Sequence, residues 1–198
     1  MSKPVASTSA SITRLDVFGP PPLLGGEDAA AYNELLVRVS AAVKPTDIVE
    51  EIWVRDIVDL AWEVFRLRRI KAGLLAAATQ NEIKRVLAEY LSDADAQELA
   101  RNWTLNDKDA RKEVQAYFDM VNLTLDGATA RAFEMKIKNI ELIDRMIASA
   151  EARHNLALRE IERHRVSVAE RLRRASEIED AEFEEVTTVP AQHQLPTP

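Results

Sequence analysis

The chain has 198 residues and a formal net charge of −7, with 46% hydrophobic and 30% charged residues, a composition typical of a globular or coiled-coil protein rather than a disordered one. It contains no cysteine, which excludes disulfides, thiolate metal sites and a cysteine nucleophile. No apolar run reaches the roughly 18–20 residues that span a bilayer, and residues 1–11 do not resemble a secretory signal, so we expect a cytoplasmic protein that does not enter membranes.

The distribution of proline and glycine divides the chain into three parts. Residues 1–26 hold four of the eight prolines and three of the five glycines, which predicts an extended arm. Residues 46–189 contain no proline and only two glycines, and because these residue types most often end helices, this stretch is predicted to be all-α. We expect the arm, a helical domain over residues 27–181, and a disordered, Thr-, Pro- and Gln-rich tail over residues 182–198.

Apolar residues at helical spacing predict five helices, over residues 29–43, 47–89, 94–102, 107–123 and 128–180. Thr46 and Asn106 are the expected N-caps of the second and fourth helices, and residues 125–127 are the expected turn before the last helix. The apolar arc of the second helix covers roughly half of its circumference. We therefore expect this helix to contact two neighbours and to form the centre of the core.

The last predicted helix would be on the order of 80 Å long, which is longer than a compact domain of this size is wide. Apolar residues and two histidines recur along it in alternating steps of three and four, as in a coiled coil. Such a stripe stays exposed unless a partner covers it, so we predict a homo-oligomer, with a dimer favoured, that forms through this helix. The predicted contact residues are Ile140, Ile143, Ile147, Ala150, His154, Ala157, Ile161, His164 and Val168.

The two histidines of this stripe suggest a response to pH. Charging an imidazole between roughly pH 5 and 7 would bring positive charge into a packed interface, so we predict that the assembly loosens on acidification. The alternative is that His154 and His164 are both half exposed and titrate without effect.

Glu151 and His154 form a Glu-x-x-His pair, which is part of the ligand set of helical di-iron sites. Such a site needs a second copy of the pair, and neither His164 nor His193 follows a glutamate by three residues. The chain also lacks a Gly-rich phosphate loop, a nucleophile elbow and an HExxH motif. We therefore expect no metal, cofactor or small-molecule ligand and no catalysis, and we keep an enzyme or metal protein built on the helical bundle as a second alternative.

Basic residues are concentrated in two places. Residues 66–71 contain three arginines and a lysine, and residues 153–174 contain seven arginines and three glutamates. Because guanidinium groups bind phosphate through two parallel hydrogen bonds, these segments are a candidate nucleic-acid surface. A solvated or self-paired helix is favoured over that interpretation, since the arginines point all round the helix and the six acids of residues 177–185 would neutralise them in another copy. The candidate nucleic-acid-binding residues are Arg66, Arg69, Arg153, Arg159, Arg163, Arg165, Arg171, Arg173 and Arg174.

Trp62 lies outside the apolar arc of the second helix, on its charged side. It either stacks with guanidinium groups or a nucleobase, or is covered by the apolar residues of the arm at positions 18–24. We favour the second interpretation, because an exposed tryptophan usually has a lid or a partner.

Three segments also resemble a known group of proteins: residues 23–36 (LLGGEDAAAYNELL), 50–59 (EEIWVRDIVD) and 158–165 (LREIERHR). They are similar to a family of uncharacterised bacterial proteins found in proteobacterial genomes, often in mobile or horizontally acquired regions, and the resemblance spans most of the chain. It implies no activity, but it does imply a cytoplasmic accessory protein. We expect a non-enzymatic helical interaction or scaffold protein that self-associates, with a nucleic-acid-binding accessory protein as the alternative.

Overall fold

The computed structural model describes residues 18–187, with side chains as far as Ile178. This part of the chain is all-α, as predicted, and contains no strand. Its helices are α1 (Ala29–Val43), α2 (Ile48–Leu87), α3 (Asp93–Thr104), α4 (Lys108–Met120) and α5 (Leu125–Thr187). None of them is both long enough and apolar enough to cross a membrane.

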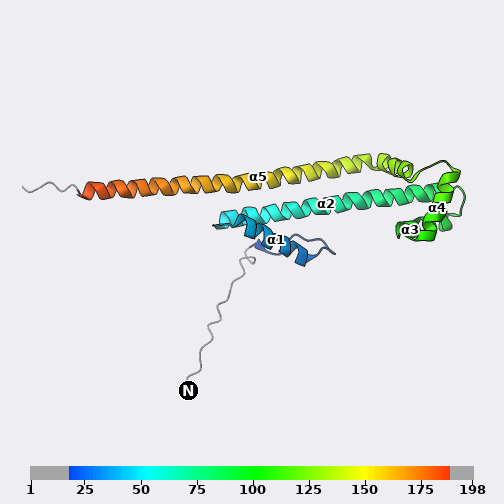
Figure 1. Ribbon diagram of the computed structural model, residues 1–198, viewed down its shortest axis with the longest axis horizontal. Helices are drawn as coiled ribbons and strands as arrows, with labels where there is room; N and C mark the ends of the chain where they lie inside the picture. Colours follow the sequence, from blue (N-terminus) through cyan, green and yellow to red (C-terminus); the bar gives the residue numbers. More distant parts are fainter. Residues whose placement is uncertain (1–17, 188–198) are drawn as a thin grey trace, which may run out of the picture.

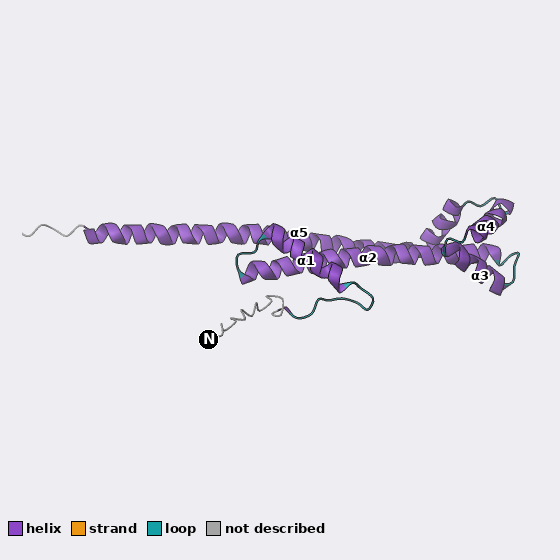
Figure 2. Ribbon diagram, turned by 60° about the horizontal axis from the view of Figure 1, so that its bottom comes forward, coloured by secondary structure: helices purple, strands orange, loops and turns teal. Residues whose placement is uncertain are grey.

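The structure is built around one antiparallel pair of helices, α2 and α5, which lie side by side along the whole of α2 (Figure 1). Ion pairs along this contact fix the register, since Arg131 of α5 pairs with Glu82, Asp144 with Lys71 and Arg165 with Glu50. The short helix α1 packs against the N-terminal half of α2, and α3 and α4 lie at its other end (Figure 2). Past the N-terminus of α2, α5 continues with no other helix beside it among the described residues.

Side chains that cap the backbone set the start of α2. Asp47, rather than the predicted Thr46, is the N-cap, and its carboxylate accepts the Glu50 N–H at 2.9 Å. The Glu50 carboxylate in turn accepts the Thr46 N–H at 2.9 Å. This reciprocal arrangement is close to a capping box and satisfies donors that the first turn of a helix leaves unpaired.

Two other helix starts also differ from the prediction. Asp107 rather than Asn106 caps α4, because Asn106 has a left-handed φ of 64° and belongs to the end of α3. The last helix begins at Leu125, since Thr124 Oγ1 accepts the Gly127 N–H at 3.0 Å and so places residues 125–127 in its first turn. That segment was predicted as a separate turn, which is wrong.

The end of α5 also lies further along the chain than the sequence indicated. The helix ends at Thr187, so residues 182–187, predicted to be disordered, are helical. Glutamate is a good helix former, and the first helix-breaking residue, Pro190, comes later. At the other end, residues 19–26 are non-helical as expected, with positive φ at Gly19 and Gly26. Residues 1–17 and 188–198, predicted as arm and tail, lie outside the described residues.

The apolar core consists of two separate clusters, and α2 contributes to both, which confirms its predicted central position. The first cluster joins α1, α2 and α5 and contains Tyr32, Leu36, Val54, Ile57, Val58, Trp62, Ala157 and Ile161. The second joins α2, α3, α4 and the start of α5 and contains Ile83, Val86, Leu87, Ala96, Ala100, Val114, Phe118 and Ala128. The part of the α2–α5 pair between them carries exposed apolar side chains, among them Ile70, Leu142 and Met146.

The apolar stripe of α5 faces α2 of the same chain. Ile140, Ala150, Ala157 and Ile161 are buried, and Ile143, Ile147, His154, His164 and Val168 are half-buried. The stripe predicted for self-association is therefore largely an intramolecular contact, and the argument that a second chain must cover it is wrong. The physical reason is that α3 and α4 reverse the chain direction, so that α5 folds back along α2.

Candidate interaction surfaces

A buried ion pair fixes the N-terminus of α2 to α5. Glu50 is fully buried, and its two carboxylate oxygens accept hydrogen bonds from Arg165 Nε at 2.8 Å and Nη2 at 2.9 Å. The same guanidinium donates to the carbonyl oxygens of Val43 and Lys44, at the end of α1. The hydrogen bonds from Arg165 lower the pKa of Glu50 to about 2, against the effect of burial. One arginine thus joins three helices, and it is not available to bind nucleic acid.

His164 lies next to this pair and also contacts α2. Its Nε2 lies 2.7 Å from Asp47 Oδ2, and its ring meets that of Trp53 edge-on, with 5.5 Å between centroids. A proton on His164 would therefore be placed beside a carboxylate. The hydrogen bond from the Glu50 N–H and the contact with His164 both lower the pKa of Asp47. The prediction that the assembly loosens on acidification assumed that this imidazole is packed among apolar side chains. For His164 that assumption is wrong, because its ring lies beside the Asp47 carboxylate.

Trp62 is covered by the start of α1 and by the segment before it. Its ring meets Tyr32 at 5.5 Å in an edge-on arrangement, and its Nε1 donates to Glu27 Oε2 at 3.0 Å. Leu23 packs against the same cluster, while Leu24 stays exposed. The structure shows coverage of Trp62 by the chain's own N-terminal segment, and it also shows the predicted guanidinium contact, since Arg69 lies over the Trp62 ring at 5.8 Å from its centroid.

Glu27, which lies beside Trp62, also binds two of the candidate arginines. Its carboxylate accepts hydrogen bonds from Arg66 Nε at 3.0 Å and Nη2 at 2.7 Å, and from Arg69 Nη2 at 2.7 Å. The hydrogen bonds from Arg66 have the largest effect and lower the pKa of Glu27 to about 2. The other two cations of this segment reach across to α5, where Arg68 pairs with Glu151 and Lys71 with Asp144.

Most arginines of α5 are also paired within the chain. Arg153 pairs with Glu63 of α2, Arg165 with Glu50, and Arg163 and Arg173 with glutamates on their own helix. Among the side chains that the structure describes, Arg159, Arg171 and Arg174 have no acidic partner. The predicted basic surface is therefore largely neutralised by ion pairs.

The Glu-x-x-His pair does not form the start of a metal site. Glu151 is engaged by Arg68 at 2.9 Å, and His154 Nδ1 lies 3.4 Å from the amide oxygen of its neighbour Asn155. Over the described part of the chain, no group of three or more histidine, aspartate or glutamate side chains is arranged to hold a metal ion.

An apolar cleft of about 300 Å³ lies between α1 and α2. It is lined by Phe18, Leu36, Val37, Pro45 and Val54, with Arg55 among its polar residues. Arg55 lies over the Tyr32 ring at 5.2 Å, but its Nε is buried and finds no hydrogen-bond partner in the described residues. Phe18 thus lies in this cleft and not on Trp62, so the predicted cover of Trp62 is supplied by a later part of the same segment.

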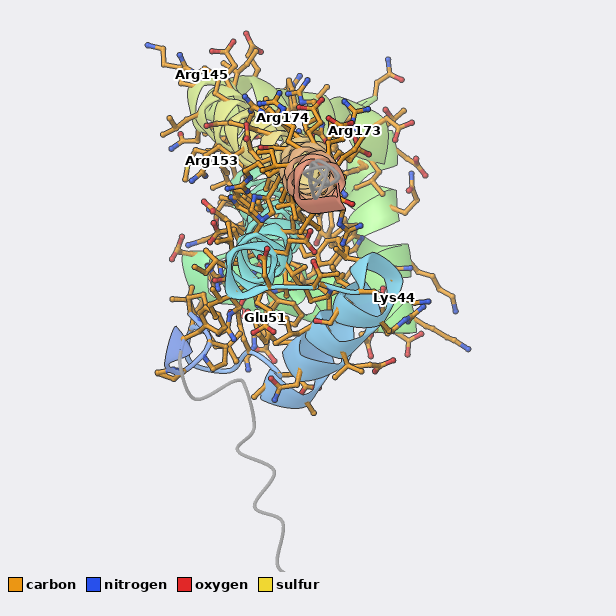
Figure 3. All side chains as sticks on the ribbon, turned by 90° about the vertical axis from the view of Figure 1, so that its left-hand side faces the viewer. Lys44, Glu51, Arg145, Arg153, Arg173 and Arg174 are labelled. Atoms are coloured by element: carbon orange, nitrogen blue, oxygen red, sulfur yellow. The ribbon has the colours of Figure 1, made fainter. Side chains whose placement is uncertain are left out.

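Exposed apolar side chains also occur on α5 at and beyond the N-terminus of α2. Val166, Leu172 and Ile178 are 60%, 67% and 61% exposed. Seen along the axis of α5, Arg173 and Arg174 lie on the side away from α2 (Figure 3). The predicted stripe ended at Val168 and did not include Leu172 and Ile178, although steps of four and three continue it through Leu172 and Ala175.

Comparison with models of protein families, with curated proteins and with solved structures found no match for this chain.

Proposed function

We propose that this is a non-enzymatic helical interaction protein of the cytoplasm that self-associates, as a dimer, through the part of α5 beyond α2. One observation carries this proposal: the segment of α5 beyond α2, which has no neighbouring helix in the described part of the chain, presents two large apolar side chains, Leu172 and Ile178, which are 67% and 61% exposed. Large apolar residues gathered on a projecting element are characteristic of protein–protein contacts.

The proposal is tested by changing the apolar residues of the projecting segment without disturbing the fold. Leu172 and Ile178 are both exposed, so replacing them with glutamate leaves the two core clusters intact. The matched control is Met135→Glu, which alters an equally exposed apolar residue, 66% exposed, in the part of α5 that runs beside α2.

We expect light scattering to give twice the chain mass of 22.2 kDa for the wild type and for Met135→Glu, and the chain mass alone for Leu172→Glu/Ile178→Glu. A wild-type protein that stays monomeric over the whole accessible concentration range would overturn the proposal. So would a dimer whose stability is unaffected by the double substitution.

A nucleic-acid-binding accessory protein is the second candidate. It is supported by Arg159, Arg171 and Arg174, which have no acidic partner among the described side chains. The test is fluorescence anisotropy of a labelled duplex of about 30 base pairs across a salt series. Affinity that falls linearly on a log–log salt plot and is lost with Arg171→Gln/Arg174→Gln supports this candidate, and the absence of binding at low salt contradicts it.

A further inference from the structure

The apolar face of α5 does not stop where α2 begins. Val168, Leu172, Ala175 and Ile178 follow Ile161 at steps of seven, four, three and three residues, which keeps them on one side of the helix. Upstream, this side packs against α2, and Ile161 is 3% exposed. Downstream, Leu172 and Ile178 are exposed. The face is a continuation of a packing surface that nothing in the described part of the chain covers.

Charges are distributed unevenly along the projecting segment. Arg171 and Arg174 lie next to the apolar positions 172 and 175, and neither has an acidic partner among the described side chains. Arg173, by contrast, pairs with Glu177 on its own helix at 3.5 Å. Five of the seven residues at 179–185 are acidic. The segment is therefore basic close to α2 and acidic towards its end.

We infer that the projecting segment is covered by the same segment of a second copy of this chain, in antiparallel orientation. This inference rests on the proposed self-association and specifies its geometry. Antiparallel overlap of residues 168–187 brings Arg171 of each copy opposite position 184 of the other, a glutamate, and Arg174 opposite position 181, which lies between Asp180 and Glu182 in the sequence. A parallel overlap would instead place arginines against arginines and acids against acids.

The same overlap also matches the shape of the molecule. Residues 168–187 extend for about 30 Å, so the last turn of the second helix reaches the point where α2 of the first copy begins. A hollow of about 200 Å³ lies there, lined by Asp47, His164, Arg165, Val168 and Leu172 among others. In this register Leu172 lies opposite position 183 of the second copy, a phenylalanine. The antiparallel orientation thus supplies a large apolar residue at the hollow.

The absence of cysteine makes the orientation directly testable by disulfide cross-linking. A disulfide requires Cα atoms about 4.4–6.8 Å apart. We expect an oxidised mixture of Leu172→Cys and Phe183→Cys proteins to give a linked dimer. Leu172→Cys protein alone should give on the order of tenfold less cross-linked dimer, because the two copies of position 172 lie about 16 Å apart along the antiparallel pair. The matched control is Glu170→Cys mixed with Phe183→Cys, since Glu170 is on the opposite side of α5 and should not cross-link.

The outcomes separate this inference from the proposed function. Efficient cross-linking of Leu172→Cys with itself indicates a parallel pair and overturns the inference. A dimer by light scattering that gives no cross-link in any combination places the interface elsewhere, which overturns the antiparallel pairing and leaves self-association standing. A wild-type protein that is monomeric by light scattering contradicts both the proposed self-association and the antiparallel pairing.

Discussion

Replacing Arg165 with glutamine removes the positive charge that faces a carboxylate without access to water. Glu50 is completely buried, and Arg165 is the only cation within ion-pair distance of it in the described residues. Without the guanidinium, the Thr46 N–H still donates to this carboxylate at 2.9 Å, but its charge is no longer compensated. The hydrogen bonds to Val43 and Lys44 at the end of α1 weaken as well.

The expected loss follows from the stabilisation of the charged form of Glu50. Its pKa falls from 4.5 to about 2, and one pKa unit corresponds to about 1.4 kcal/mol, which gives about 3 kcal/mol. The side chain of Arg165 is 43% exposed, so solvent screening reduces this figure. We therefore expect Arg165→Gln to lower the free energy of unfolding by about 2–3 kcal/mol, close to the lower end of the range for breaking a buried ion pair.

Urea denaturation followed by far-ultraviolet circular dichroism measures this difference. The matched control is Arg163→Gln, which removes an arginine two residues away whose side chain is 70% exposed and pairs with Glu160 on the same helix. Arg163→Gln should lower the free energy of unfolding by less than about 1 kcal/mol. If the two variants lose the same free energy within 0.5 kcal/mol, roughly the scatter expected of a surface substitution, the buried pair does not stabilise the junction and the reasoning fails.

Three further predictions concern the core and its buried carboxylates. Ile161→Ala should lower the free energy of unfolding, measured by urea denaturation, by about 2–4 kcal/mol, because Ile161 is buried against α2. Leu158→Ala, at a 38% exposed position, should lower it by less than about 1 kcal/mol. Equal losses would contradict the assignment of the α5 stripe to the intramolecular contact. Because the pKa values of Glu27 and Glu50 are both lowered, their stabilisation is fully present above about pH 4.5 and is lost as the pH falls towards 2, so the midpoint of thermal unfolding should fall across that interval. Glu27→Gln should lower stability at pH 7 and flatten this pH dependence, and an unchanged profile would show that Glu27 does not contribute to it.

The helices could be predicted from the sequence because their signals are local. Proline and glycine are nearly absent from residues 46–189, and apolar spacing identified all five helices of the described region. Their exact starts were less predictable, because several residues at each start are able to cap. At α2, Thr46 and Asp47 are both good N-caps, and Asp47 takes the position because its carboxylate accepts the Glu50 N–H, while the Glu50 carboxylate accepts the Thr46 N–H.

The partner of the α5 stripe could not be predicted from periodicity alone. A stripe with steps of three and four has the same pattern whether it packs against a second chain or against another helix of its own chain. One signal did indicate the correct answer, namely the wide apolar arc of α2, which required two neighbours. The ion pairs were also beyond local rules, since Arg68 and Glu151 are 83 positions apart and Glu50 and Arg165 are 115 apart.

The Glu50–Arg165 pair also marks the boundary between two uses of the same helix. Before this point, the apolar side of α5 packs against α2, and Arg153 and Arg165 are neutralised by acids of α2. Beyond it no second helix is available in the described chain, and Arg171 and Arg174 lack acidic partners there while the apolar side continues. The apolar face therefore loses its intramolecular partner close to the last of the ion pairs that join α5 to α2. This coincidence is expected if a second protein surface takes the place of α2, and it explains why self-association is assigned to the end of α5 and not to the stripe that the sequence first indicated.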